Sequence, residues 1–331
     1  MLLNKQKDQV KQSVINSDNS SQAIAYERTF YALGTKNSIK ILEIKNEQAL
    51  DQAVQRVLEI DQKMSAYNED SDISKIRKNA GKGYVTVDKD TYTLIKKSVQ
   101  YSKDFNGAFD ITIRPLIELW GINKKGDYIP STSEIKKVLP LVDYKDISFR
   151  NLSKSIALKK ENQAIDLGGI AKGYAADEVC RILKENGVNS AIINLGGNII
   201  TLGKKIDGTP FRIGIQNPMS RTGDIIGTLN VTDKTIVTSG SNERFFIKDG
   251  VRYHHLLNPR TGMPARSGLL SVTVICNKSI EADALSTAIF IQGMERGRKL
   301  LKDKKAEAIF IHEDLSALVT EGLKDNFQLR M

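Results

Sequence analysis

LLSVTVICNKSIEADALSTAIFIQ, residues 269–292, changes its hydrophobic period once along its length. Its first eight residues alternate and include Val, Thr and Ile, which predicts a β-strand. The part after Ser279 is rich in Ala, Leu and Ile at helical spacing, which predicts a helix. The segment is therefore a strand, a short polar turn and a helix, around which we arrange the other elements.

Asp283 and Thr287 lie four residues apart on the predicted helix and so share one face. Small alanines beside them leave the backbone approachable. A carboxylate and a hydroxyl in this arrangement could hold one hard cation. The pair equally fits an acid in the first helical turn that favours the helix dipole, next to a threonine bonded to the helix backbone.

Composition describes an ordinary globular protein of 331 residues, enough for one large domain or two. The net charge of +10 comes from Lys and Arg that are scattered along the chain, without a basic stripe or interleaved aromatic residues. We therefore expect no nucleic-acid partner; a nucleotide or an anionic cell surface fits the charge equally well. Cys180 and Cys276 lie in apolar patterns and are predicted to be free thiols.

Residues 1–22 are polar and rich in Lys, Gln, Asn and Ser. This composition predicts a flexible tether, as would remain if a signal or lipid-anchor segment had been removed. No apolar run in the sequence reaches the roughly 18 to 20 residues of a membrane span.

Several other elements follow from periodicity. Residues Ala25–Tyr31 and Ser38–Ile44 predict an opening hairpin around a turn at Gly34 and Thr35. Glu47–Lys63 carries apolar residues at three- and four-residue spacing, which predicts a helix. Residues 122–162 are Lys-rich and interrupted by prolines, so we expect them to be peripheral.

The stretch Ala164–Asn198 contains two matched tetrapeptides, DLGG and NLGG. It reads as strand, Gly-Gly turn, helix from about Ile170 to Asn186, strand and second Gly-Gly turn, which predicts a βαβ-like unit with both turns at one edge. The helix start would direct free N–H groups at an anion, and Lys172 adds a positive charge. Tight packing of strand on helix would explain the glycines as well.

Two further stretches carry candidate polar residues. In FNGAFDITIRPLIELWG, residues 105–121, Asp110 is either a turn acid within core packing or a ligand contact. In YHHLLNPRTG, residues 253–262, His255 precedes a turn that contains Pro and ends in Gly, which makes it a better candidate for chemistry than His312. We expect His312 to be structural.

Taken together, these segments resemble the ApbE family of flavin transferases. The matching motifs are LGT at Leu33, MSAY at Met64, AFDITIRPL at Ala108, IDLGGIAKGYAAD at Ile165, NLGGN at Asn194, HLLNPRTG at His255 and EADALSTA at Glu281. Their order covers nearly the whole chain. The chain departs from the family at Leu33, where Met is commoner, and at Ser241 and Asn242, where the family usually carries an acid and a Tyr.

The resemblance implies an α+β fold of ApbE type, with T-fold-like mixed sheets, flanking helices and an active site in a cleft between two subdomains. Residues 23–331 would form this flavin transferase domain. The resemblance also implies Mg²⁺ held by the side chains of Asp283 and Thr287 and the carbonyl of Gly169. FAD would lie with its pyrophosphate over the metal, near Lys172. The other residues implied to contact FAD are Leu33, Tyr67, Ala108, Phe109, Asp110, Asp166 and Leu257.

The activity implied by the resemblance is transfer of FMN from FAD to a threonine hydroxyl of an acceptor protein, with release of AMP. Asp283 would act in catalysis through the metal, and His255 would handle a proton near the acceptor or the phosphate. Two alternatives stay open: hydrolysis of FAD to FMN and AMP, and FAD binding without catalysis. The family also implies an extracytoplasmic lipoprotein, anchored at the cell surface or in the periplasm, that acts on a redox protein.

Overall fold

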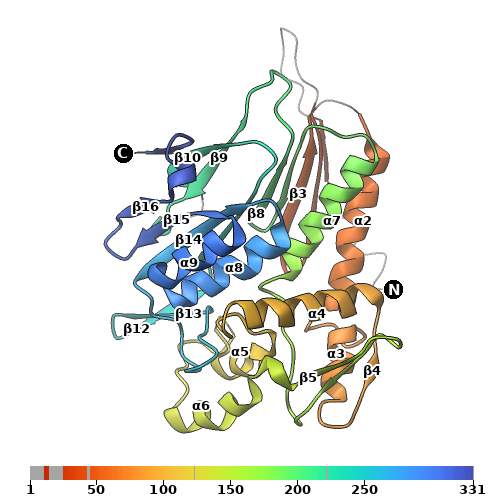
Figure 1. The fold of residues 1–331 in the computed structure, drawn as a ribbon, viewed down its shortest axis with the longest axis vertical. Coiled ribbons are helices and arrows are strands. Elements are labelled where there is room, and N and C mark those ends of the chain that lie inside the picture. Colours follow the sequence, from red (N-terminus) through yellow and green to blue (C-terminus); the bar gives the residue numbers. More distant parts are fainter. Residues whose placement is uncertain (1–10, 15–24, 43–44, 123, 221–222, 331) are drawn as a thin grey trace.

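The computed structural model describes residues 11–14, 25–42, 45–122, 124–220 and 223–330. Its largest element is a sheet in which every described pair of neighbours is antiparallel (Figure 1). In spatial order its strands are β1 (Lys11–Val14), β2 (Tyr26–Ala32), β3 (Thr35–Ile41), β7 (Ala191–Leu195), β8 (Asn198–Leu202), β11 (Thr235–Gly240), β14 (Leu269–Cys276), β15 (Glu307–His312) and β16 (Ala317–Val319). The predicted opening hairpin is β2 and β3.

Helices cover one face of this sheet and a second sheet covers part of the other. The helices are α2 (Glu47–Met64), α7 (Ala171–Glu185), α8 (Ser279–Gln292) and α9 (Met294–Lys304). The second sheet contains β9 (Phe211–Gln216), β10 (Ile225–Val231) and β17 (Phe327–Leu329). The predicted α+β class is therefore confirmed, whereas a cleft between two subdomains stays a prediction.

Strand β14 lies in the middle of these layers, and all eight of its residues are buried. Val272 and Val274 pack in the core on the helical side, and Ile275 packs in the core shared with the second sheet. Because both faces are covered, the strand is apolar almost throughout. The predicted unit of strand, turn and helix is confirmed as β14 and α8.

A smaller group of elements lies below the large sheet in Figure 1. Its helices are α3 (Asp72–Lys78), α4 (Lys89–Asp104), α5 (Arg114–Trp120) and α6 (Thr132–Val138), with 3₁₀ turns at Ile111–Ile113, Leu139–Leu141 and Tyr144–Asp146. Its strands are β4 (Val85–Thr86), β5 (Ile147–Arg150) and β6 (Ser155–Leu158), and a separate hairpin is formed by β12 (Phe245–Lys248) and β13 (Val251–His254). A last 3₁₀ turn, Glu321–Leu323, precedes β17.

Three sequence predictions have a different or incomplete outcome. Within the predicted tether, residues 1–10 and 15–22 lie outside the described part, but Lys11–Val14 is strand β1, since its backbone pairs with Tyr26–Thr29. The first strand of the βαβ-like unit is absent, because residues 164–167 do not form a strand. NLGG instead closes the β7–β8 hairpin.

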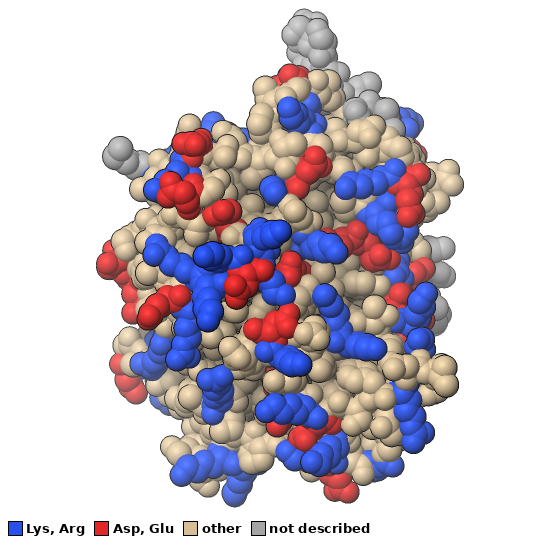
Figure 2. All heavy atoms as spheres, viewed as in Figure 1, with Lys and Arg blue, Asp and Glu red and all other residues tan. Residues whose placement is uncertain are grey.

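Surface features agree with an ordinary globular protein. Figure 2 shows basic and acidic side chains intermixed over the face that carries α4, α8 and α9. Cys180 and Cys276 are free thiols, as predicted. No helix in the described part of the chain is both long and apolar enough to cross a membrane. The expectation of no nucleic-acid partner stays a prediction.

Helices α7 and α8 meet at their first turns. The carboxylate of Asp177 on α7 accepts hydrogen bonds from the N–H groups of Ser279 and Ile280, at 2.8 and 2.9 Å. It thereby caps the start of α8, where the preceding residue, Lys278, offers no side-chain cap. A Cβ atom at Gly173 would lie 2.3 Å from the carbonyl oxygen of Ser279, so only glycine permits this approach.

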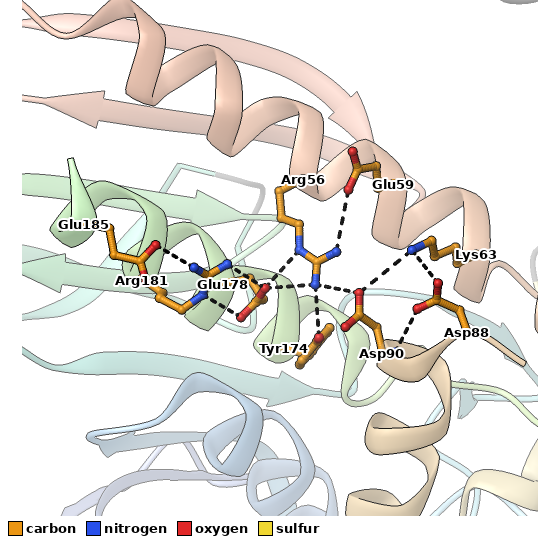
Figure 3. Close-up of polar contacts among 9 residues, drawn as sticks. All are labelled: Arg56, Glu59, Lys63, Asp88, Asp90, Tyr174, Glu178, Arg181 and Glu185. Carbon is orange, nitrogen blue, oxygen red and sulfur yellow. Dashed lines mark hydrogen bonds and ion pairs between the residues drawn. The ribbon is translucent and has the colours of Figure 1, made fainter. Parts of the chain in front are cut away.

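A network of ion pairs fixes α7 to α2 and α4 (Figure 3). Nη2 of Arg56 on α2 lies 2.7 Å from Asp90 of α4 and 2.9 Å from Glu178 of α7. Burial opposes ionisation of Glu178, but hydrogen bonds from Arg181 and Arg56 outweigh it and lower the pKa of Glu178. Because Arg56 is largely buried and contacts several partners, this network contributes more than isolated surface pairs would.

Replacing Gly173 by Ala tests the contact between α7 and α8. We expect the free energy of unfolding to fall by about 1–3 kcal/mol, because the added methyl group meets backbone atoms that cannot move aside. The matched control is Gly297→Ala on α9, whose Cβ would meet side-chain atoms of Ile289, the nearest at 2.6 Å, and no backbone atom within 3.5 Å. Denaturant unfolding of both variants measures the difference. Equal stability of the two variants would contradict the role given to Gly173.

Candidate active site

The first Gly-Gly turn lies directly against helix α8. A Cβ atom at Gly169 would lie 3.6 Å from Oγ1 of Thr287 and 3.3 Å from Cε2 of Phe109. Residues from three distant parts of the sequence therefore meet at one corner. The sequence-predicted residues Gly169, Thr287 and Phe109 are brought together here.

Asp283 lies one turn before Thr287 on helix α8. Its Oδ2 accepts a hydrogen bond of 2.9 Å from the N–H of Gly173, and its Oδ1 lies 3.9 Å from Nζ of Lys172. The side chain of Asp283 is only 6% exposed. A buried carboxylate with one cationic partner at this distance is incompletely compensated, which favours a further positive charge nearby.

The hydroxyl of Thr287 lies between two possible hydrogen-bond acceptors. Its Oγ1 is 3.3 Å from the carbonyl oxygen of Asp283 and 3.4 Å from Oγ of Ser239. The backbone contact that the sequence left open is thus present. Ser239 was missed by the sequence analysis; it lies in strand β11, two residues before Ser241, where the chain departs from the family pattern.

The donors at this corner fit a hard cation in their chemistry. The side chains of Asp283 and Thr287 and the main chain of Gly169 all offer oxygen, the ligand that Mg²⁺ prefers. Among the described residues, no group of three or more His, Cys, Asp or Glu side chains is placed to hold a metal. Any cation at this corner would therefore depend on one carboxylate together with neutral oxygen atoms.

Asp166 and Tyr67 flank the corner through a shared arginine. Nη1 of Arg114 donates a 3.0 Å hydrogen bond to Asp166, whose other oxygen accepts one of 2.8 Å from the N–H of Gly168. The guanidinium carbon of Arg114 lies 4.3 Å from the centre of the Tyr67 ring, and Nζ of Lys124 lies 4.1 Å from it. Tyr67 is 63% exposed and thus offers an aromatic surface with two cations beside it.

Asp110 has the role of a turn acid. Its Oδ1 accepts hydrogen bonds from the N–H and the hydroxyl of Thr112, at 2.8 and 2.6 Å, and its Oδ2 accepts one of 3.0 Å from the N–H of Tyr144. Burial raises the pKa of Asp110 in spite of these bonds. Of the two roles left open by the sequence, the carboxylate fills the structural one. Contact of FAD with Asp110 or with its buried neighbours Ala108 and Phe109 stays a prediction.

Leu33 and Leu257 are the remaining residues that were expected to contact FAD. Leu33 has a φ of +54° in the turn between β2 and β3, a conformation that favours Gly or Asn. In the described part of the chain, no hydrogen bond or ion pair joins Leu33 to Asp283 or Lys172. Leu257, two residues after His255, is buried and forms a β-bridge with Pro264.

His255 lies where the β12–β13 hairpin ends. Its backbone N–H donates to the carbonyl oxygen of Arg244 at 3.0 Å, and its Nδ1 lies 3.3 Å from the same oxygen. Because a carbonyl only accepts, this contact requires the proton on Nδ1 and leaves Nε2 as a free acceptor.

Burial of the ring, followed by the charges of Arg244, His254 and Lys172, lowers the pKa of His255 to about 3. The charge of Lys172, whose Nζ lies 3.9 Å from Asp283, is among the causes of this shift. His254 is structural instead: its Nε2 lies 2.9 Å from the carbonyl oxygen of Ala265, and its Nδ1 accepts from the N–H of Leu256 at 3.3 Å. Burial lowers its pKa to about 4.

The fold and this corner define an α+β protein with an oxygen-rich polar site between two helices and a hairpin. The chain matches the model of the ApbE family over residues 33–310, and it belongs to this family. It is 34% identical to an FAD:protein FMN transferase of Klebsiella pneumoniae, over 78% of this chain and 80% of that protein. It is 30% identical to an FAD:protein FMN transferase of Treponema pallidum, over 92% and 89% of the two chains.

Solved structures agree with this assignment. The ApbE protein of Thermotoga maritima superimposes with a TM-score of 0.82 at 35% identity, covering 90% of this chain and 97% of that one. The apo form of the flavinyl transferase ApbE of Pseudomonas stutzeri also has a TM-score of 0.82, at 26% identity, covering 95% and 100%.

A ¹⁵N NMR titration of the three histidines tests the state of His255. We expect His255 to carry its proton on Nδ1 and to titrate with a pKa of about 3, with His254 near 4. Between these values and the ordinary 6.5, the unfolded chain binds protons that the folded chain does not. The free energy of unfolding should therefore fall as pH falls through this range. A pKa near 6.5 for His255 would contradict the burial described here.

Proposed function

We propose that this chain is an Mg²⁺-dependent FAD:protein FMN transferase, which moves FMN from FAD to a threonine hydroxyl of an acceptor protein and releases AMP. Its relatives bear the name of this activity. The observation that carries the proposal is the incompletely compensated carboxylate of Asp283, buried beside Lys172 at the corner where Gly169 meets Thr287.

Asp283, Thr287 and the carbonyl of Gly169 would hold the Mg²⁺ ion. When bound, the ion supplies positive charge that offsets the negative charge developing on the pyrophosphate oxygens. Lys172 adds a second positive charge, and its bond of 3.0 Å to the carbonyl oxygen of Gly168 fixes the ammonium group beside the turn. Arg114 and Tyr67 would bind another part of the dinucleotide through charge and stacking.

His255 would accept the proton of the attacking hydroxyl at Nε2. In the reaction the threonine oxygen forms a bond to the FMN phosphorus, and the bond between that phosphorus and the oxygen bridging to AMP breaks. In the protein without FAD, burial and then nearby positive charges lower the pKa of His255. The two negative phosphates of FAD would oppose those charges and raise the proton affinity of the ring. Positioning and charge together account for much of the rate in phosphoryl transfer.

The acceptor would be an extracytoplasmic redox protein, and this chain a lipoprotein anchored at the cell surface or in the periplasm. The polar composition of residues 1–10, which precede strand β1, suits a tether between an anchor and a domain and supports this part of the proposal. FAD hydrolysis is the alternative in which water replaces the threonine.

Asp283→Asn tests the site and the function together. We incubate the wild type with FAD, Mg²⁺ and a threonine-containing acceptor and expect flavin fluorescence on the acceptor, whereas FMN and AMP alone would indicate hydrolysis. The variant should lose about 10²- to 10³-fold in turnover, a typical cost of removing one stabilising charge. It should also lose the rise in Tm that Mg²⁺ gives the wild type.

The matched control for this test is Asp146→Asn. Asp146 is a buried carboxylate that lies 2.7 Å from Nζ of Lys160, away from the site. This variant should keep both the turnover and the Mg²⁺-dependent rise in Tm. Unchanged turnover of Asp283→Asn at low Mg²⁺ would overturn the metal assignment. Tight FAD binding without any turnover of the wild type would indicate a binding protein instead.

His255→Gln tests the proton acceptor. We expect kcat for transfer to fall about 10²- to 10⁴-fold, the usual range for general base catalysis, while the Kd for FAD changes little. His312→Gln, at the end of β15, is the control and should leave both values unchanged. An equal loss of FAD affinity and kcat in His255→Gln would make His255 a binding residue.

A further inference from the structure

A third hydrophobic cluster, separate from the two cores of the large sheet, supports the segment that carries His255. Its buried members come from two stretches of the chain. Leu116, Trp120 and Ile135 belong to α5 and α6, whereas Phe246 and Leu257 come from the hairpin and the residues after it. Residues 122–162, which the sequence described as peripheral, thus supply part of the support for the candidate base.

Trp120 is the centre of this cluster. It is the only tryptophan of the chain and is completely buried. Its ring stacks on Tyr253 at a centroid distance of 5.9 Å, and Tyr253 stacks on Phe246 at 5.2 Å. Nε1 of Trp120 donates a 2.7 Å hydrogen bond to the carbonyl oxygen of Gly262. One side chain therefore holds the backbone on both sides of His255.

The turn after His255 is itself closed. The N–H of Asn258 donates to the carbonyl oxygen of Met263, and the N–H of Gly262 donates to that of Asn258, both at 2.8 Å. A Cβ atom at Gly262 would lie 2.6 Å from Cγ2 of Ile135, so the turn packs closely on α6. The segment from Tyr253 to Gly262 is thus a closed unit that rests on Trp120.

Hydrogen bonds give the ring of His255 little support, although the ring is partly buried. Its described hydrogen bond is the contact of 3.3 Å between Nδ1 and the carbonyl oxygen of Arg244, which is long for a hydrogen bond. One long contact cannot fix the place of Nε2 to the accuracy that proton transfer needs. The position of the backbone must supply the rest.

We propose that Trp120 is a positioning residue for His255, which fixes Nε2 toward the reacting groups by holding Tyr253 and Gly262. The inference rests on the proposed function of His255. Trp120 touches neither substrate nor reacting atoms in this account, and it acts through the hairpin and the closed turn.

The experiment is a double-mutant cycle of Trp120→Phe with His255→Ala, measured as kcat and KM for FMN transfer. Trp120→Phe keeps a ring for stacking but removes the hydrogen bond to Gly262. We expect it to lower kcat about tenfold in the wild type, with less than about a threefold change in KM for FAD. In the His255→Ala background it should change kcat less than about twofold, because the base it positions is gone.

Phe211→Leu is the control for general loss of packing, since Phe211 is equally buried but belongs to the second sheet. It should leave kcat within about twofold at temperatures where the protein is folded. Tyr253→Leu serves as a second variant if Trp120→Phe folds poorly, because Tyr253 is only partly buried. Its effect on kcat should likewise disappear in the His255→Ala background.

A ¹⁵N spectrum of the histidines separates failure of this inference from failure of the proposed function. In the wild type, His255 should show a single Nδ1-protonated tautomer, and in Trp120→Phe its signals should move toward averaged values, whatever reaction the site performs. An unchanged His255 signal, or an equal loss of kcat in both backgrounds, would overturn the role of Trp120. Absence of FMN transfer by the wild type would overturn the proposed function. The ¹⁵N spectrum would then still test whether Trp120 positions the ring of His255.

Discussion

The close approach of α7 to α8 is the constraint on which the site depends. Because Gly173 has no side chain, its backbone lies against the carbonyl of Ser279, and its N–H reaches the carboxylate of Asp283 at 2.9 Å. The same approach lets Asp177 cap the start of α8. Lys172 precedes Gly173 and Gly169 precedes the helix, so both take their places from this one contact. A larger residue at Gly173 would move the oxygen donors on α8, Asp283 and Thr287, relative to Gly169.

The residues of the site lie on two parts of the molecule that pack on different hydrophobic clusters. Its oxygen donors lie on elements fixed by the main core, since α8 packs on the fully buried strand β14 and α7 is held to α2 and α4 through Arg56. His255 follows a two-stranded hairpin that packs on the third cluster instead. Precise geometry between Asp283 and His255 therefore requires that these two hydrophobic units keep one relative position.

Hydrophobic periodicity in the sequence correctly predicted several helices and strands. The strand and helix at residues 269–292, the helix at Glu47–Lys63 and the shared face of Asp283 and Thr287 follow from periodicity alone. The predicted strand before the first Gly-Gly turn failed for a non-local reason, since β3 and β8 occupy both edges of β7. Ser239, Arg114 and Arg244 were missed because only tertiary contacts bring them to the site.

The charges around His255 connect proton transfer to the presence of substrate. Burial disfavours protonation of the ring most, and the charges of Arg244 and Lys172 add to this, so the isolated site keeps a neutral histidine with Nε2 free. A polyphosphate bound beside Lys172 would offset part of this positive charge and so increase the basicity of Nε2. The histidine would then be a stronger base when its substrate is present. The same positive charges that weaken the base in the free protein are those that attract the dinucleotide.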